Sequence, residues 1–365
     1  MSSVPTAGLR ARLERLLTGA WTGRGPIAWL LLPLSWLYAA GHACHLALYR
    51  SGLLRSWRVG LPVVVVGNLY AGGAGKTPLV IELVRELKSR GFRPGVISRG
   101  YGRAGHDVRP VEPGSRADEV GDEPLLIAQQ AATPVVVGAD RVTAARVLRS
   151  LNPKCDVIVC DDGLQHPRLA RDLEVAVLHF RGLGNGWRLP AGPLRDSPRR
   201  LGTVDAVVLN GDVPTIRIER PVFRMHSELG EVYALADPRQ RAPLATLVGE
   251  QRSKNVRLVA AAGIAAPEQF FAMLREAGLD FEAIALPDHY DYAANPFAGR
   301  EFDVALVTEK DAVKCAASAA VRADGRICAV SLRTRLDAAL VDLIASRIRP
   351  QSAAAEKPTD GPPPA

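Results

Sequence analysis

One segment constrains this chain more than any other: a run of valines, then a glycine-rich loop, then a helical pattern. Val63–Val66 is a continuous β-branched run, typical of a strand that is buried on both faces of a parallel sheet. Gly67–Thr77 follows with four glycines, and apolar residues then recur at helical spacing over 79–87. Gly91 stands where such a helix would end. This order of strand, glycine loop and helix predicts a phosphate-binding loop.

The residue types of this loop suit the terminal phosphates of a nucleotide. Glycines let backbone N–H groups surround phosphate oxygens, and the helix N-terminus adds its positive dipole. Lys76 can reach the β- and γ-phosphates, and the Thr77 hydroxyl can bind Mg²⁺. The strict pattern would place glycine where Tyr70 stands, so a glycine-rich turn with a chance Lys-Thr remains the alternative. The residues predicted to bind the nucleotide are Asn68, Gly72, Gly73, Ala74, Gly75, Lys76 and Thr77.

A second strand with an acidic end supports this prediction. Residues 156–160 form another buried strand pattern, which runs into Asp161-Asp162-Gly163. Enzymes with phosphate-binding loops place a Mg²⁺ contact at the carboxyl end of such a parallel strand. Either Asp161 or Asp162 could fill that role, and a turn without a ligand is the alternative.

Other polar residues are weaker candidates on their own. Arg99 and Arg103 follow a short strand pattern and could hold an anionic substrate, although a solvated basic loop fits equally well. Asp122 precedes a predicted helix and could be only its N-cap. His289 follows a strand pattern, and a lone histidine is more often structural than catalytic. Residues 181–200 are rich in Gly, Pro and Arg and predict a long ordered loop, often a functional feature.

The N-terminal region is both basic and apolar. The chain has a net charge of +8, and residues 1–60 hold seven arginines against one acidic residue, Glu14. Ile27–Ala43 is mostly apolar, close to the roughly 20 residues that a membrane span requires. Arginines flank both ends and Pro33 interrupts the run, so an interfacial helix and a true span both remain open, beside a buried core helix or a cleaved signal peptide. The pattern favours an anionic membrane surface over nucleic acid as the partner.

The remaining sequence predicts an α/β protein. Strand and helix patterns alternate again towards the C-terminus, which indicates a second, smaller α/β unit. The five cysteines form no C-x-x-C pair, which argues against a zinc ribbon or a thioredoxin-like site. The predicted divisions are a membrane-associating segment at 1–58, a core with a phosphate-binding loop and a parallel sheet at 59–212, a β-rich connection at 213–256, a C-terminal α/β domain at 257–348 and a disordered tail at 349–365.

Seven short segments, taken in order, resemble the tetraacyldisaccharide 4'-kinases, the lipid A 4'-kinases of Gram-negative inner membranes. They are 66–68 with 72–78, 98–102, 121–124, 161–166, 189–195, 287–289 and 308–311. The resemblance implies an ATP- and Mg²⁺-dependent kinase at the cytoplasmic face of the inner membrane. Its substrate would be the 4'-hydroxyl of a tetraacylated glucosamine disaccharide 1-phosphate.

The same resemblance implies roles for individual residues. Asp122 and His289 would form a catalytic pair that orients the attacking hydroxyl, and phosphoryl transfer needs such positioning more than a strong base. The site residues expected on this basis are Asp122, His289 and Asp162 for catalysis, Thr77 and Asp161 for the metal, and Arg99 and Arg195 for the substrate.

Two positions depart from the family pattern. Tyr70 replaces a small hydroxyl residue, and Asp196-Ser197 stands where the family tends towards Glu-Pro.

Two other classes of protein fit the sequence less well. A P-loop ATPase or GTPase that acts as a switch or metallochaperone is disfavoured, because Ala71 replaces a signature lysine and no Cys/His cluster is visible. The intact Lys76, Thr77 and Asp161 disfavour a non-enzymatic membrane scaffold.

Overall fold

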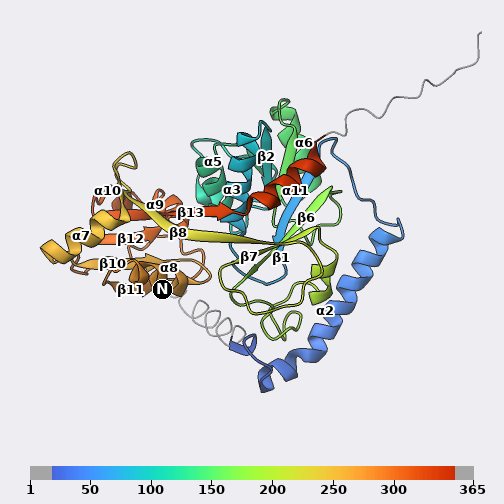
Figure 1. Cartoon of the computed structure of the whole chain (residues 1–365), viewed down its shortest axis with the longest axis horizontal. Helices are drawn as coiled ribbons and strands as arrows, with labels where there is room; N and C mark the ends of the chain where they lie inside the picture. The colour runs from blue at the N-terminus through green and yellow to red at the C-terminus, as the bar shows by residue number, and fades with distance from the viewer. Residues whose placement is uncertain (1–18, 350–365) are drawn as a thin grey trace, which may run out of the picture.

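The computed structural model describes residues 19–349, so the predicted tail beyond Arg349 and the first arginines of the chain lie outside the described residues. Within them, one 13-stranded sheet runs through the molecule with helices on both faces (Figure 1). The helices are α2 (Pro26–Arg50), α3 (Lys76–Ser89), α4 (Ala117–Val120), α5 (Asp122–Ala131), α6 (Arg141–Leu151), α7 (Leu244–Lys254), α8 (Pro267–Glu276), α9 (Glu309–Cys315), α10 (Ala319–Ala323) and α11 (Ala338–Ile348), with a 3-10 turn at Pro198–Gly202.

The strands follow the order β11-β10-β12-β13-β8-β7-β6-β1-β5-β2-β4-β3 across the sheet, and β9 pairs with β8. They are β1 (Val63–Asn68), β2 (Pro94–Ser98), β3 (Arg109–Pro110), β4 (Val135–Val137), β5 (Val157–Asp161), β6 (Leu173–His179), β7 (Ala206–Asn210), β8 (Val222–Ala234), β9 (Arg241–Pro243), β10 (Leu258–Ala262), β11 (Glu282–Ala285), β12 (Val304–Thr308) and β13 (Ile327–Leu336). We call β1–β7 with their helices the larger half and β10–β13 with theirs the smaller half.

The larger half is parallel except at its edge strand β3. Every residue of β1 and β5 is buried, as expected for strands that are covered on both faces. Helices α3, α5 and α11 pack on one face, and α6 packs on the other. Val66 pairs in register with Asp161, which brings the start of the glycine loop beside the acidic end of β5. The predicted α/β fold with a mainly parallel sheet is confirmed.

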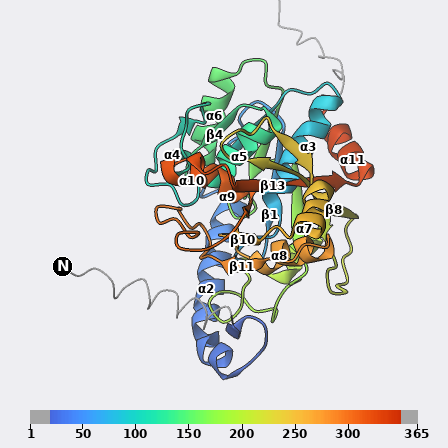
Figure 2. The same ribbon diagram turned by 90° about the vertical axis from the view of Figure 1, so that its left-hand side faces the viewer.

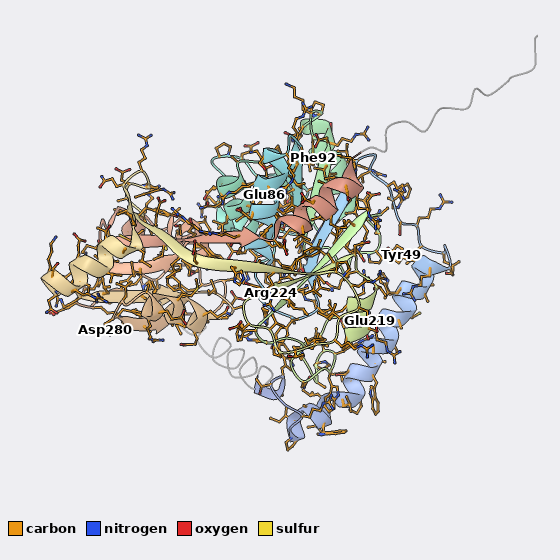
Figure 3. The ribbon with its side chains drawn as sticks, in the orientation of Figure 1. Tyr49, Glu86, Phe92, Glu219, Arg224 and Asp280 are labelled. Carbon is orange, nitrogen blue, oxygen red and sulfur yellow. The ribbon has the colours of Figure 1, made fainter. Side chains whose placement is uncertain are left out.

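The smaller half joins the larger one through β8. This strand pairs in parallel with β7 and antiparallel with β13, and Figure 1 shows the long β8–β13 ribbon running between the halves. In Figure 2 the smaller half lies in front of the larger one. Figure 3 places Arg224 of β8 near the middle of the molecule, and Asp280 at the far end of the smaller half. Residues 213–256, predicted to be a β-rich connection, contain β8 and β9 and also the helix α7, which was not predicted.

Helix α2 lies at the side of the larger half, outside the helical layers that cover the sheet (Figure 1). It is the one helix among residues 19–349 that is long and apolar enough to cross a membrane. Trp29, Leu30, Trp36 and Leu37 are exposed, at 58%, 81%, 65% and 68% respectively. The helix continues through Pro33 without a break.

The opposite side of α2 is fixed to the loop at residues 181–200. Ser35 is buried, and its hydroxyl donates to the Arg188 carbonyl at 2.9 Å. The Tyr38 hydroxyl donates to the Arg195 carbonyl at 2.8 Å, and Trp21, just before the helix, donates to the Pro190 carbonyl at 2.9 Å. These bonds tie the apolar helix to a loop that also reaches the glycine loop, where the Ala71 N–H donates to the Pro193 carbonyl at 2.7 Å.

Candidate active site

The glycine loop is braced from within by Asn68, the last residue of β1. Its side-chain amide donates to the carbonyls of Tyr70 and Gly72, at 2.8 and 3.2 Å. Gly75 has a φ of +79°, a left-handed conformation that favours glycine, and it forms the N-cap of α3. The loop therefore leads into a helix N-terminus, where free N–H groups can receive an anion.

Lys76 points from the first turn of α3 towards the acidic end of β5. Its ammonium lies 3.2 Å from Asn68 Oδ1 and 3.5 Å from Asp162 Oδ1. The residue is buried at 8% exposure, so its charge acts in a region of reduced dielectric. Thr77 follows in the same turn and is also buried. The structure thus brings together the lysine and the aspartates that the sequence analysis placed at one sheet edge.

Asp161 ends β5 with one carboxylate oxygen left unpaired. Oδ2 accepts a hydrogen bond from the Ser98 hydroxyl at 3.0 Å, whereas Oδ1 is buried and has no hydrogen-bond partner in the described part of the chain. Burial, together with the charges of Glu123 and Asp162, raises the pKa of Asp161 to about 7. A divalent cation would satisfy this orphaned oxygen, so the residues present fit the predicted Mg²⁺ site.

Thr77 and Asp161 are the metal ligands that the sequence predicts at this edge. No group of three or more His, Cys, Asp or Glu side chains within residues 19–349 could hold a metal ion by itself. That arrangement suits Mg²⁺, which typically binds through one or two protein oxygens plus substrate phosphates and water.

Asp162 is held between two cations. Arg195 Nη1 lies 3.0 and 2.8 Å from its two oxygens, and Lys76 approaches from the other side. Burial favours the neutral acid, but Lys76 and Arg195 outweigh it and lower the pKa of Asp162 to about 2. Asp162 therefore stays ionised and aligns both cations, while its φ of +51° turns it away from the strand. The catalytic role predicted for it stays a prediction.

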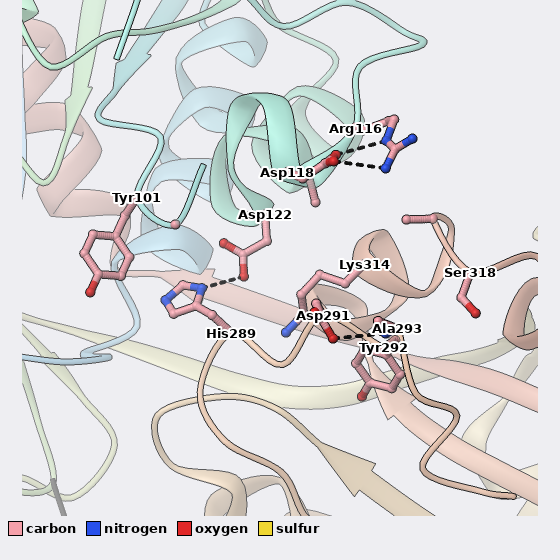
Figure 4. Close-up of a pocket in the computed structure, with 13 residues that line it drawn as sticks. Tyr101, Arg116, Asp118, Asp122, His289, Asp291, Tyr292, Ala293, Lys314 and Ser318 are labelled. Atoms are coloured by element: carbon pink, nitrogen blue, oxygen red, sulfur yellow. Dashed lines mark hydrogen bonds and ion pairs between the residues drawn. The ribbon is translucent and has the colours of Figure 1, made fainter. Parts of the chain in front are cut away.

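Asp122 and His289 meet although 167 positions separate them in the chain. Asp122 is the first residue of α5, and His289 lies in the loop after β11 with a φ of +59°. His289 Nδ1 lies 2.9 Å from Asp122 Oδ2 (Figure 4). The Glu123 N–H donates to Asp122 Oδ1 at 2.9 Å. Gly121 is the N-cap, so the alternative that Asp122 serves only as an N-cap is wrong.

Electrostatics favour an ionised Asp122. Its side chain is only 4% exposed, and such burial favours the neutral acid. The hydrogen bond to His289 and the charge of Lys310, whose Nζ lies 3.7 Å from Oδ2, overcome this effect and lower the pKa of Asp122. A charged carboxylate can fix the orientation of the imidazole by accepting its Nδ1–H.

A polar pocket opens beside this pair. It is lined by Tyr101 and Asp118 from the larger half and by Asp291 and Lys314 from the smaller half, among others (Figure 4). The Tyr101 ring lies 5.2 Å from the His289 ring, measured between centroids. The pair therefore lies at a junction of the two halves that solvent or a substrate group can reach.

The two predicted substrate-binding arginines lie in different settings. Arg195 contacts Asp162, as described above, whereas Arg99 is exposed and its side chain has no hydrogen bond or ion pair within residues 19–349. Arg103 bonds to the Asp107 carbonyl instead of facing solvent. Substrate roles for Arg99 and Arg195 stay predictions.

Several residues of the site were not predicted. Gln165 donates to the Asn68 carbonyl at 3.1 Å, and Ser98 holds Asp161. Asn210, the last residue of β7, donates to the Ala74 carbonyl of the glycine loop at 3.4 Å. Lys310 donates to Glu123 at 2.9 Å. Each follows a predicted strand or belongs to one of the seven segments, but spacing alone does not show which neighbour it meets.

Comparison with known proteins decides the family. A family model described as tetraacyldisaccharide-1-P 4'-kinase (LpxK) matches residues 27–349. The chain is 47% identical to a tetraacyldisaccharide 4'-kinase of Janthinobacterium sp. (strain Marseille), with 94% of this chain and 99% of the relative covered. It is 46% identical to that of Herminiimonas arsenicoxydans, with coverage of 96% and 100%. The chain belongs to the tetraacyldisaccharide 4'-kinase family.

A solved structure supports the assignment. The chain resembles LpxK from Aquifex aeolicus, whose crystal structure was determined in complex with ATP, with a TM-score of 0.73 and 29% identity. The match covers 88% of this chain and 99% of that one. Membership of the tetraacyldisaccharide 4'-kinase family confirms the resemblance of the seven segments.

The two residues that depart from the pattern of the tetraacyldisaccharide 4'-kinase family both make contacts near the site. Tyr70 is buried, with its ring 5.0 Å from that of His179 and 6.4 Å from that of Trp21. Asp196 accepts from the Ser197 N–H at 2.7 Å and lies 3.8 Å from His42 of α2. Both residues thus join the site to the N-terminal helix region.

Proposed function

We propose that this chain transfers the γ-phosphoryl group of ATP to the 4'-hydroxyl of a tetraacyldisaccharide 1-phosphate, as a step of lipid A biosynthesis. Family membership over nearly the whole chain gives the activity. The single observation that carries the proposal is the meeting of a phosphate-binding lysine, an orphaned carboxylate and an Asp–His pair around one sheet edge. Glu123 stands between these parts: it directly follows Asp122 in the chain, and its charge contributes to the raised pKa of Asp161.

The larger half provides the residues that bind the phosphates of ATP. The loop at 72–75 and the N-terminus of α3 bind phosphate oxygens, and Lys76 neutralises charge on the terminal phosphates. Thr77 and Asp161 would hold Mg²⁺, which supplies charge neutralisation between the phosphates when it is bound with ATP. Asp162 keeps Lys76 and Arg195 in place, with contacts of 3.5 and 2.8 Å.

The Asp122–His289 pair provides the acceptor end. Asp122 holds Nδ1 of the imidazole, so Nε2 faces away from the carboxylate and can accept the proton of the sugar hydroxyl as transfer proceeds. Such a transfer does not need a strong base, since positioning and charge neutralisation carry most of the catalysis. The geometry therefore suits a hydroxyl acceptor.

Label transfer tests this function directly. The full-length protein is incubated with γ-³²P ATP, Mg²⁺ and the disaccharide 1-phosphate lipid in detergent micelles. We expect label on the lipid, and a substrate that lacks the 4'-hydroxyl should remain unlabelled. ATP hydrolysis without lipid labelling would favour a switch ATPase instead, an alternative that no observed feature supports.

We further propose that α2 places the enzyme at the cytoplasmic face of the inner membrane. Its exposed side chains include Leu30, Trp36 and Leu37, and also Trp29, whose ring packs edge-on against Trp187. Arginines such as Arg24 and Arg50 stand at both ends. Apolar side chains with a basic flank bind anionic bilayers. The acyl chains of the substrate must remain in lipid, so a membrane-bound enzyme can meet the sugar at the surface.

Flotation with vesicles of anionic phospholipid tests this placement. We replace Trp29, Leu30, Trp36 and Leu37 together by serine, because these side chains are exposed. Since Trp29 also packs against Trp187, circular dichroism first checks that the variant folds. The variant should remain in solution while the wild type floats. Leu151→Ser, an exposed leucine on α6, is the matched control and should float. Flotation of the quadruple variant would contradict the placement.

A further inference from the structure

The Thr308–Asp311 segment is a sequence motif to which the proposed reaction assigns no role. It follows β12 and opens α9, where the Thr308 hydroxyl accepts a hydrogen bond from the Asp311 N–H at 3.1 Å and caps the helix. Glu309 accepts a hydrogen bond from Gln130 of α5 at 2.7 Å. The segment therefore lies where the smaller half meets the larger one.

Lys310 reaches across this junction to the catalytic pair. Its ammonium lies 2.9 Å from Glu123 Oε1 and 3.7 Å from Asp122 Oδ2. That same Asp122 oxygen contacts His289 Nδ1 at 2.9 Å. A fixed cation and the imidazole thus share one carboxylate oxygen, and the Lys310 side chain is only 18% exposed.

Glu123 determines where the ammonium lies. Its ion pair with Lys310, at 2.9 Å, is shorter than the 3.7 Å contact of Lys310 with Asp122, so Glu123 is the main anchor of the cation. An ion pair shielded from water holds its geometry better than an exposed one, in which two long side chains remain mobile. The Lys310 ammonium therefore keeps a fixed position beside Asp122.

The same short helix holds the backbone next to His289. Asp311 Oδ2 accepts from the Gly263 N–H at 3.1 Å, and Lys314 donates to the Gly263 carbonyl at 3.0 Å. That carbonyl also accepts from the His289 N–H at 3.2 Å. Helix α9 consequently supports both members of the pair, through Lys310 on one side and through Gly263 on the other.

We propose that Lys310 is a positioning residue for phosphoryl transfer: held by Glu123, its ammonium keeps the Asp122 carboxylate aligned with His289 across the junction. Lys310 acts through Asp122, the carboxylate that His289 contacts. This inference rests on the proposed kinase function and on Asp122–His289 as its catalytic pair.

The first test measures label transfer to the lipid by full-length variants. Lys310→Met removes the charge, and we expect kcat to fall about tenfold or more while the KM for ATP changes less than about threefold. Lys310→Arg retains the charge and should lose less than about threefold in kcat. Lys254→Met, at an exposed lysine of α7, is the matched control and should keep wild-type kcat. An unchanged kcat in Lys310→Met would overturn the proposal.

The decisive comparison repeats Lys310→Met in an Asp122→Asn background. If Lys310 acts through the Asp122 charge, Lys310→Met should lower kcat less than about twofold in the Asp122→Asn background, because the effects of coupled residues are not additive. An equal loss in both backgrounds would show that Lys310 acts independently of Asp122, and the proposal fails. Should the methionine variant not fold, Lys310→Gln serves in both backgrounds.

Failure of the kinase function is recognised separately. It shows as absent label transfer by the wild-type protein, before any variant is compared. Failure of the Lys310 proposal shows as additive losses in a wild type that does transfer label.

Discussion

The phosphate-binding cluster (Lys76, Asp161, Asp162 and Arg195) and the acceptor cluster (Asp122, His289 and Lys310) are built differently. The first comes entirely from the larger half, where Asn68 and Arg195 brace its charged groups. The second draws on both halves, since Asp122 begins α5 while the other two residues follow β11 and β12. The side chains of the phosphate-binding cluster therefore all come from one half, whereas those of the acceptor cluster come together only where the halves meet.

Removing Lys76 should produce the largest loss. Lys76→Met deletes the cation that lies 3.5 Å from Asp162 and that we propose to neutralise the terminal phosphates of ATP. We expect kcat/KM for label transfer to fall about a thousandfold or more. Lys254→Met again serves as the control. Near-normal turnover would show that the phosphate-binding cluster does not bind the nucleotide, and the contrast between the two clusters would then fail.

His289→Ala should separate the two clusters. We expect kcat to fall about a hundredfold, the scale of general base catalysis, because Asp122 loses its imidazole partner. ATP binding, measured by titration calorimetry, should stay close to wild type, since His289 belongs to the other half. His226→Ala, at an exposed histidine of β8, is the matched control. A collapse of ATP binding would show that the clusters are one unit.

Arg195→Ala should have a smaller effect within the phosphate-binding cluster. Asp162 loses the guanidinium nitrogen that contacts both of its oxygens but keeps Lys76, so we expect kcat/KM to fall about tenfold. Arg199→Ala, an exposed neighbour in the same loop, should behave as wild type in the label-transfer assay. A loss as large as that of Lys76→Met would mean that Arg195 has a role of its own beyond Asp162.

The smallest effect is expected from the contact between the halves. Gln130→Ala removes the 2.7 Å bond to Glu309 and should lower the free energy of unfolding by about 1 kcal/mol, measured by urea denaturation. We expect kcat to fall about twofold and ATP affinity to stay unchanged, because only the acceptor cluster depends on the junction. Gln129→Ala, its exposed neighbour, is the control. Weaker ATP binding in Gln130→Ala would argue against the independence of the phosphate-binding cluster.

The same contrast explains what the sequence could predict. The phosphate-binding loop is contiguous, so Val63–Val66 and the glycines before Lys76 show both the fold and the chemistry locally. The position of Asp161 beside this loop could be predicted because strand ends gather at one edge of a parallel sheet. These inferences need only short-range patterns and the general geometry of α/β folds.

The acceptor cluster could not be found in that way. Asp122 and His289 lie 167 positions apart, and by residue type one suggests an N-cap and the other a structural histidine. Only the family resemblance paired them. Lys310 belongs to a recognisable segment, but its ion pair with Glu123 depends on how α5 and α9 pack. Helix α7 was missed because its apolar residues show little helical periodicity.

The loop that bonds to α2 also links this helix to the site. Ser35 and Tyr38 hold Arg188 and Arg195 by their carbonyls, and the Arg195 side chain ends on Asp162. The distance between the apolar face of α2 and Asp162 is therefore fixed by hydrogen bonds within the protein. With α2 at the bilayer surface, as we propose, these bonds set the height of the site above the lipid, and the length of the acyl chains does not enter.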